Sequence, residues 1–201
     1  MIKTCVFDLG NVLVNFSHEK MCRQIGALCG KTGSEIQEIL FGSGLQHRFE
    51  CGKVCKEEFV SELEGLVKTQ FDLDELILAG SDIFDLNREM FALLEELSQT
   101  NMRLVLLSNT SIGHYEFVGR KFNLFRYFHA EVLSFKVGAV KPDDEIYRDA
   151  LAKIDCDPQE CFFTDDIPEY VTAAQKHGIR AEVFVDAKTC RQSLVRYGVL
   201  Q

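Results

Sequence analysis

Five short apolar runs, separated by segments of helical periodicity, constrain the fold of this chain more than any other feature. Their aliphatic, aromatic and β-branched side chains indicate buried strands. The runs fall at residues 4–7, 103–107, 130–133, 161–164 and 181–185. Helical patterns accompany the later runs, at residues 90–97, 115–122, 145–154 and 168–177. Because alternating strands and helices are typical of a mostly parallel sheet covered on both faces, the sequence predicts an α/β fold.

Residues 16–86 interrupt this alternation. The segment contains helical patterns and no run that indicates a strand; the patterns fall at residues 19–29, 34–41, 56–67 and 73–78. A chain of 201 residues is long enough for one domain with an insertion. We therefore predict a core formed by residues 1–15 and 87–201, with a small all-helical unit, residues 16–86, inserted after the first strand.

Charge and composition exclude several classes of function. The formal net charge is −9 and no run of Lys and Arg is present, which argues against a nucleic-acid partner. No apolar run approaches 18 residues and the N-terminus carries no signal segment, so we expect a cytoplasmic protein without a membrane partner. Cys51 and Cys55 have no second pair or His at zinc-ligand spacing, which argues against a zinc site.

Polar side chains follow four of the predicted strands, where the ligand site of a parallel sheet lies. They are Asp8, Ser108 with Asn109, Lys141 before Pro142, and the pair Asp165 and Asp166. Taken singly, each has an ordinary explanation, because acids and Ser-Asn pairs cap helices and turns and most lysines are solvated. Together they place a carboxylate nucleophile, small donors, one cation and an acidic pair at one edge. This combination predicts a catalytic site.

The same segments carry a resemblance to the haloacid dehalogenase-like hydrolase superfamily across essentially the whole chain. Its four motifs resemble VFDLGNVLV, LVLLSNTS, VKPDDEIY and FFTDDIPEYVTAA in this sequence. Within the insertion, HRFECGKVCKEEF is similar to the pattern of members with a small helical cap. The FDLGNV form is similar to sugar-phosphate phosphatases and to the phosphatase domain of soluble epoxide hydrolases. The resemblance implies a Rossmann-like core and a helical cap over the strand ends.

The resemblance also implies how the site acts on phosphate esters. It makes Asp8 the nucleophile that forms an aspartyl phosphate, which splits a slow hydrolysis into two easier steps. It implies a Mg²⁺ site formed by Asp8, the backbone carbonyl of Gly10 and Asp166, with Asp165 as a supporting acid or alternative ligand. Carboxylate and carbonyl oxygens suit this ion.

The remaining motif residues have roles around the transferred phosphoryl group. The resemblance implies that Lys141 pairs with Asp8 and the phosphoryl group, and that Ser108 and Asn109 donate hydrogen bonds to phosphoryl oxygens. An acidic protein repels phosphate at long range, so a local cation such as Lys141 or Mg²⁺ is needed.

Gly10 is a departure from the family pattern, which usually has a second Asp at this position as general acid and base. General acid–base catalysis typically contributes roughly 10²–10⁴-fold. Three explanations are open. The leaving group has an acidic alcohol, such as an anomeric sugar or aryl oxygen; a cap residue, His18, His47 or Glu50, supplies the proton; or the reaction is not phosphate-ester hydrolysis.

The leading hypothesis is a Mg²⁺-dependent phosphatase acting on a small phosphorylated metabolite, such as a sugar phosphate. A metal-free C–halogen hydrolase would use the same Asp8 nucleophile but would gain nothing from Asp165 and Asp166. A phosphonate hydrolase would need a Schiff-base lysine in the cap, and no motif places one. A non-catalytic binding protein is the remaining alternative, because Gly10 replaces the usual acid.

Overall fold

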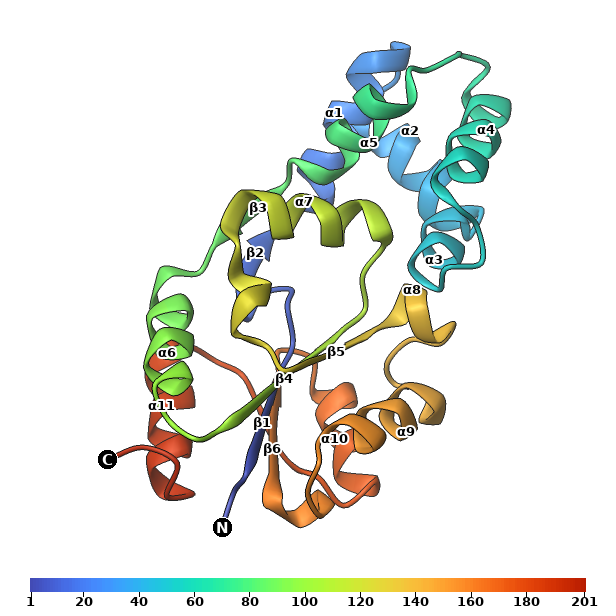
Figure 1. The fold of residues 1–201 in the computed structure, drawn as a ribbon. Helices are drawn as coiled ribbons and strands as arrows, with labels where there is room; N and C mark the ends of the chain where they lie inside the picture. Colours follow the sequence, from blue (N-terminus) through green and yellow to red (C-terminus); the bar gives the residue numbers. More distant parts are fainter.

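A parallel five-stranded sheet forms the centre of the molecule in a computed structural model that covers residues 1–201 (Figure 1). The strands are β1 (Thr4–Phe7), β4 (Arg103–Ser108), β5 (Ala130–Leu133), β6 (Cys161–Asp165) and β7 (Arg180–Val183). They lie in the order β5-β4-β1-β6-β7, and every neighbouring pair is parallel. The carboxyl ends of the strands therefore meet at one edge, with the end of β1 between those of β4 and β6.

Each face of the sheet packs on its own set of helices, because successive residues of a strand point to opposite sides. Cys5 and Phe7 share a buried cluster with α6, α7 and α11, whereas Val6 shares a second cluster with α9 and α10. These helices are α6 (Arg88–Ser98), α7 (Ile112–Phe122), α9 (Asp144–Lys153), α10 (Pro168–Lys176) and α11 (Ala187–Arg196). Figure 1 shows α6 and α11 on one side of the sheet and α9 and α10 on the other. The predicted α/β, Rossmann-like fold is confirmed.

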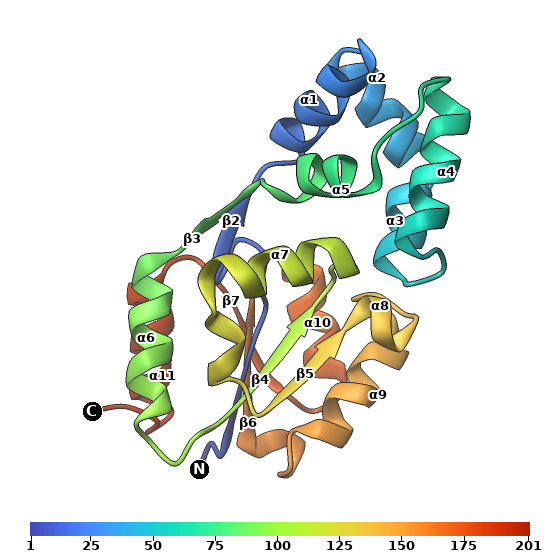
Figure 2. The same cartoon turned by 45° about the horizontal axis from the view of Figure 1, so that its top comes forward.

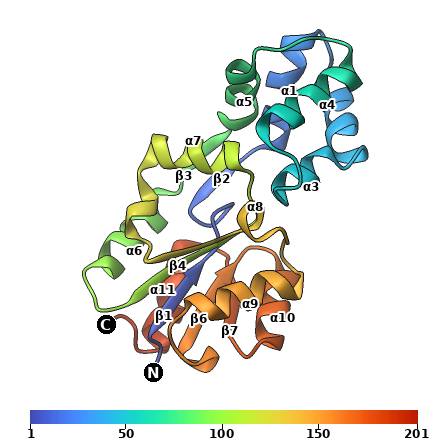
Figure 3. The same cartoon turned by 45° about the vertical axis from the view of Figure 1, so that its right-hand side comes forward.

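Helices from the inserted segment form a cap beyond the carboxyl ends of the strands (Figure 3). They are α1 (His18–Cys29), α2 (Gly33–Gln37), a π-helical turn η1 (Glu38–Gly42), α3 (Leu45–Glu50), α4 (Lys56–Val67) and α5 (Leu73–Ser81). Side-chain caps fix several of their starts: Ser17 accepts a hydrogen bond from the backbone of Lys20 at α1, and Asp72 accepts one from Glu75 at α5.

Two short strands connect this cap to the core, β2 (Val14–Phe16) and β3 (Phe84–Leu86). They pair in an antiparallel register that places Val14 opposite Leu86, and Figure 2 shows them side by side between the two parts. The sequence indicates no strand within residues 16–86, so that expectation is wrong for β3. The expected boundary after residue 15 falls inside β2, and the division into core and cap domains stays a prediction.

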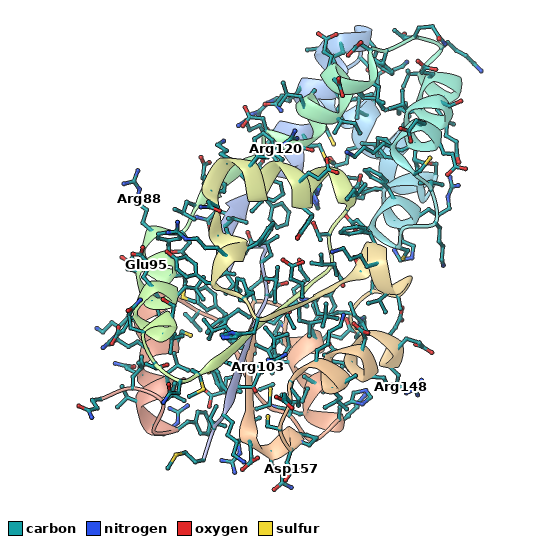
Figure 4. All side chains as sticks on the ribbon, in the orientation of Figure 1. Arg88, Glu95, Arg103, Arg120, Arg148 and Asp157 are labelled. Carbon is teal, nitrogen blue, oxygen red and sulfur yellow. The ribbon has the colours of Figure 1, made fainter.

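The remaining elements are short: η2 (Leu124–Tyr127), α8 (Ser134–Val137) and η3 (Pro158–Glu160). The helical layers present their charged residues to solvent; Figure 4 shows Arg88 of α6 and Arg148 of α9 pointing outward from opposite sides of the core. No helix combines the length and the apolar character needed to cross a bilayer.

Candidate active site

A cavity of about 190 Å³ lies at the carboxyl edge of the sheet, between the strand ends and the cap. Most of the residues selected from the sequence line it: Asp8, Gly10, His18, Glu50, Ser108, Asn109, Lys141 and Asp166. Asp165 is fully buried just outside this lining, where it contacts Lys141. Among the selected residues, only His47 and Asp165 are absent from the cavity wall.

Lys141 is the centre of a buried ion network beneath the cavity. Its ammonium donates hydrogen bonds to Asp8 Oδ1 at 2.6 Å, to Asp165 Oδ2 at 2.5 Å and to the carbonyl of Leu107 at 3.2 Å. The Lys141 side chain is only 1% exposed, and the Asp165 side chain is completely buried. Three acceptors match the three donors of the ammonium, so the position of its charge is fixed.

Burial and charge act in opposite directions on the groups of this network. Burial raises the pKa of Asp8 to about 7, although the nearby ammonium of Lys141 favours the ionised form. Burial alone would lower the pKa of Lys141, but the carboxylates of Asp8 and Asp165 outweigh it and hold that pKa above its usual value. Lys141 is therefore a permanent cation at neutral pH. A second positive charge near Asp8, such as a metal ion, would further favour its ionised form.

Three carboxyl groups, those of Asp8, Asp165 and Asp166, converge at this edge, with one oxygen of each within 4.8 Å of the others. Asn11 Nδ2 donates to Asp166 at 3.1 Å, and the backbone N–H of Ile167 donates to Asp165 at 2.9 Å. When all three are ionised, three negative charges meet one ammonium and an excess of two remains. Such a donor set fits a divalent cation that prefers oxygen ligands.

Asn109 holds the backbone of Lys141 in place. Its Oδ1 accepts from the Lys141 N–H at 2.7 Å, and its Nδ2 donates to the Lys141 carbonyl at 3.0 Å. The alternative role of Ser108 and Asn109 as the cap of the next helix does not apply, because Ser111 caps α7 through the N–H of His114. Ser108 is buried at the end of β4, and its hydroxyl makes only a 3.4 Å contact with its neighbour's carbonyl.

Gly10 has an ordinary backbone, because it is absent from the residues with positive φ. A Cβ placed on Gly10 would lie only 2.8 Å from Cε1 of Phe16, so the ring of Phe16 occupies the space that a side chain would need. Residue 10 therefore brings no carboxyl to the cavity, and the ring of Phe16 occupies part of the space that an aspartate side chain would need there.

The three cap residues considered for proton transfer occupy different surroundings. His47 lies away from the cavity, with Nε2 at 3.6 Å from the thiol of Cys51. His18 lines the cavity between aromatic rings, 4.9 Å from Phe16 and 5.1 Å from Phe41 by ring centroids, and burial lowers its pKa. Glu50 also lines the cavity; its pKa is raised by burial, and Gln46 Nε2 donates to its Oε1 at 2.7 Å.

Several residues of the cavity wall, among them Asn11, Tyr170 and His114, are not predicted from the positions of the strand ends. Asn11, one residue beyond Gly10, positions Asp166 through its amide. Tyr170 lines the cavity from α10, and its ring centroid lies 5.1 Å from Lys141 Nζ, a distance suited to a cation–π contact. The start of α10 at Pro168 was a usable signal for Tyr170, because the first turn of a helix after a strand end faces the same edge.

Comparison with known proteins agrees with this geometry. A family model described as haloacid dehalogenase-like hydrolase matches residues 2–178. The chain is 27% identical over 175 residues to the D-ribitol-5-phosphate phosphatase of Bacteroides thetaiotaomicron, a match that covers 83% of this chain and 84% of that protein.

Two further proteins extend the comparison. The chain is 27% identical over 156 residues to flavin mononucleotide hydrolase 1 of Arabidopsis thaliana; the match covers 75% of this chain but only 61% of the plant protein. Among solved structures, the HAD family enzyme bt-2542 from Bacteroides thetaiotaomicron, in its magnesium complex, superposes with a TM-score of 0.84 at 25% identity. That alignment covers 97% of this chain and 98% of the other.

Proposed function

The chain belongs to the haloacid dehalogenase-like hydrolase family, and we propose that it is a Mg²⁺-dependent phosphatase that acts through an aspartyl phosphate on Asp8. One observation carries the proposal. The carboxyl of Asp8 lines the cavity, bonded on one side to the Lys141 ammonium and grouped on the other with Asp166. This arrangement combines a nucleophile, a fixed cation and an oxygen-rich metal site in a single wall.

The chemistry assigned to these residues has two steps. In the first, a carboxylate oxygen of Asp8 bonds to phosphorus while the bond from phosphorus to the leaving oxygen breaks. In the second, water attacks the phosphorus of the aspartyl phosphate, and inorganic phosphate and the Asp8 carboxylate are released. Lys141 stabilises the negative charge of the phosphoryl group in both steps, because its position is fixed by three hydrogen bonds.

Asp8, Asp166 and, as a supporting ligand, Asp165 would hold Mg²⁺, together with the backbone carbonyl of Gly10. When bound, the ion neutralises charge on the phosphate and favours the ionised form of Asp8, whose pKa is otherwise raised to about 7. The donors Ser108 and Asn109 are proposed to contact phosphoryl oxygens, with the Asn109 amide also committed to the Lys141 backbone.

The proposed substrate is a small phosphorylated metabolite such as a sugar phosphate. A cavity of about 190 Å³ supports a compact leaving group, and the similarity to a ribitol-5-phosphate phosphatase supports the same class. The metal-free C–halogen hydrolase alternative gives no account of Asp166, a third carboxyl beside Asp8 and Asp165.

The direct test is hydrolysis of p-nitrophenyl phosphate with and without a divalent cation. We expect turnover with Mg²⁺, loss of turnover in excess chelator, and recovery when Mg²⁺ is restored. Asp166→Asn should raise the Mg²⁺ concentration required for the half-maximal rate, because it removes one anionic oxygen from the cluster. Equal turnover in excess chelator would rule out the metal assignment.

A further inference from the structure

The cavity contains three carboxyl groups, and one of them does not belong to the acidic cluster. Asp8 and Asp166 lie in that cluster at the strand ends, whereas Glu50 enters from α3 of the cap. We propose that Glu50 is the general acid and base of the reaction, supplying from the cap the function that Gly10 lacks. This inference rests on the proposed phosphatase function of Asp8.

Glu50 is held over the site by a direct link between cap and core. Ser134, the first residue of α8, donates from its hydroxyl to the Glu50 carbonyl at 2.6 Å. The same hydroxyl accepts the backbone N–H of Thr110 at 2.9 Å, just beyond the end of β4. The end of α3 is therefore tied to the segment that follows Ser108 and Asn109, and Figure 3 shows α3 beside α8.

Gly52 permits this close approach. Its φ is 63°, and a Cβ at this position would lie 2.1 Å from the carbonyl oxygen of Phe135, an impossible contact with backbone. The segment Glu50-Cys51-Gly52 thus combines a carboxyl in the cavity with a glycine two residues later that lets the cap backbone rest on α8. This explains in physical terms why an acid and a glycine stand at this spacing.

The surroundings of Glu50 suit a proton donor. Gln46 Nε2 donates to Oε1, so the acid proton belongs on the other oxygen, Oε2. The partner is a neutral amide, and burial raises the pKa of Glu50, which keeps the proton on the carboxyl at higher pH than usual. The hydrogen bond from Gln46 and the nearby His47 favour the ionised form of Glu50, but both act more weakly than burial.

The two histidines of the cavity wall are poorer donors. Burial lowers the pKa of His114 to about 4, and its Nε2 lies 3.1 Å from the carbonyl of Gly80. Burial also lowers the pKa of His18, whose ring lies between two phenylalanine rings. Both imidazoles are therefore neutral at pH 7, whereas a leaving alkoxide needs an acid that still holds its proton.

The proton balance closes with Glu50 alone. As the bond from phosphorus to the leaving oxygen breaks, that oxygen keeps the bonding electrons and takes the proton of Glu50. The resulting carboxylate then removes a proton from the water that attacks the aspartyl phosphate. One cycle returns Glu50 to its acid form and consumes one water.

The test is a series of phosphate esters whose leaving alcohols span a wide range of pKa, assayed with Mg²⁺ in wild type and Glu50→Gln. Glutamine keeps the shape of the side chain but cannot donate or accept the proton. For primary alkyl phosphates, we expect kcat/KM of Glu50→Gln to fall by about 10²–10⁴-fold. For p-nitrophenyl phosphate the loss should be much smaller, because that leaving group needs little protonation.

Glu38→Gln is the matched control, since Glu38 is an exposed carboxyl on the same cap and lies outside the cavity. It should leave the dependence on leaving-group pKa unchanged. If Glu50→Gln lowers all substrates equally, or lowers none, Glu50 does not transfer the proton. If the wild type hydrolyses no phosphate in the series, the phosphatase proposal itself fails, and the assignment of Glu50 fails with it.

Discussion

The cavity has two walls with opposite electrostatic character. On the core side, Asp8 and Asp165 both bond to the ammonium of Lys141, so each of these buried charges has a charged partner. On the cap side, the carboxyl of Glu50 has the amide of Gln46 as its partner, and the imidazole of His18 lies between aromatic rings. The strand-end carboxyls thus face a buried, permanently charged ammonium, whereas burial favours the neutral forms of Glu50 and His18 in the cap.

This contrast matches a division of labour in phosphoryl transfer. Fixed charges are needed where the phosphoryl group sits, and a group that still holds its proton is needed where the alcohol leaves. Environments that separate the behaviour of two carboxyls in one cavity commonly distinguish an acid from a nucleophile. The strand ends provide the first environment through Lys141, and the cap provides the second through Glu50.

The two walls predict opposite effects on stability when a titratable side chain is replaced by a neutral one: Lys141→Met should lower the free energy of unfolding, and Glu50→Gln should raise it at neutral pH. Lys141→Met should destabilise the protein by about 3–5 kcal/mol, because it leaves two buried carboxylates without their cation. Denaturant unfolding measures this free energy. Lys3→Met is the control, because its ion pair with Glu160 is exposed to solvent and should contribute little to stability.

If Lys141→Met lowers the free energy of unfolding no more than Lys3→Met does, the proposed difference between the two walls is wrong. That result would mean that Asp8 and Asp165 accommodate each other in the folded state without the ammonium, and that the core wall is not held together by charge.

Glu50→Gln should have the smaller effect, in the opposite direction. Below the ordinary glutamate pKa of about 4.3, Glu50 is protonated in both the folded and the unfolded chain. Above that pH the unfolded chain releases the proton, while the folded chain retains it because burial raises the pKa of Glu50. The wild type therefore loses stability relative to Glu50→Gln as the pH rises.

Thermal unfolding at several pH values measures this effect. Each 1 kcal/mol of difference shifts Tm by about 2–4 °C in a protein of this size. We expect a higher Tm for Glu50→Gln at pH 7 and no difference near pH 3. A Tm advantage that is constant with pH, or that also appears in Glu38→Gln, would show that the carboxyl of Glu50 is not held in its protonated form.

The core wall could be predicted from the sequence, and the cap wall largely could not. Asp8 and Ser108 follow buried apolar runs, and parallel strands bring their carboxyl ends together without further information. The place of Glu50 depends on contacts between segments that are far apart in the sequence, such as its bond to Ser134. The hydrophobic periodicity of residues 16–86 predicts helices but not their contacts with distant segments. A three-residue strand such as β3 is too short to show an alternating pattern.

The same limit applies to Asn109 and to the last helix. The sequence places Asn109 at the site but does not reveal that its amide pairs with the backbone of Lys141, 32 residues away. Helix α11 gives a weak signal because the side chains it buries are mostly small or weakly apolar, with Leu194 as the one large aliphatic residue among Ala187, Cys190, Ser193 and Leu194.

Trapping the covalent intermediate shows whether Asp8 carries the phosphoryl group during turnover. The wild type is mixed with p-nitrophenyl phosphate and Mg²⁺, quenched with borohydride, and digested for mass spectrometry. Borohydride reduces an acyl phosphate to an alcohol, so we expect homoserine at position 8, and none with excess chelator or in Asp8→Asn, whose amide cannot form the acyl phosphate. Steady turnover of the wild type with an unmodified Asp8, or with the reduced residue elsewhere, would contradict the account.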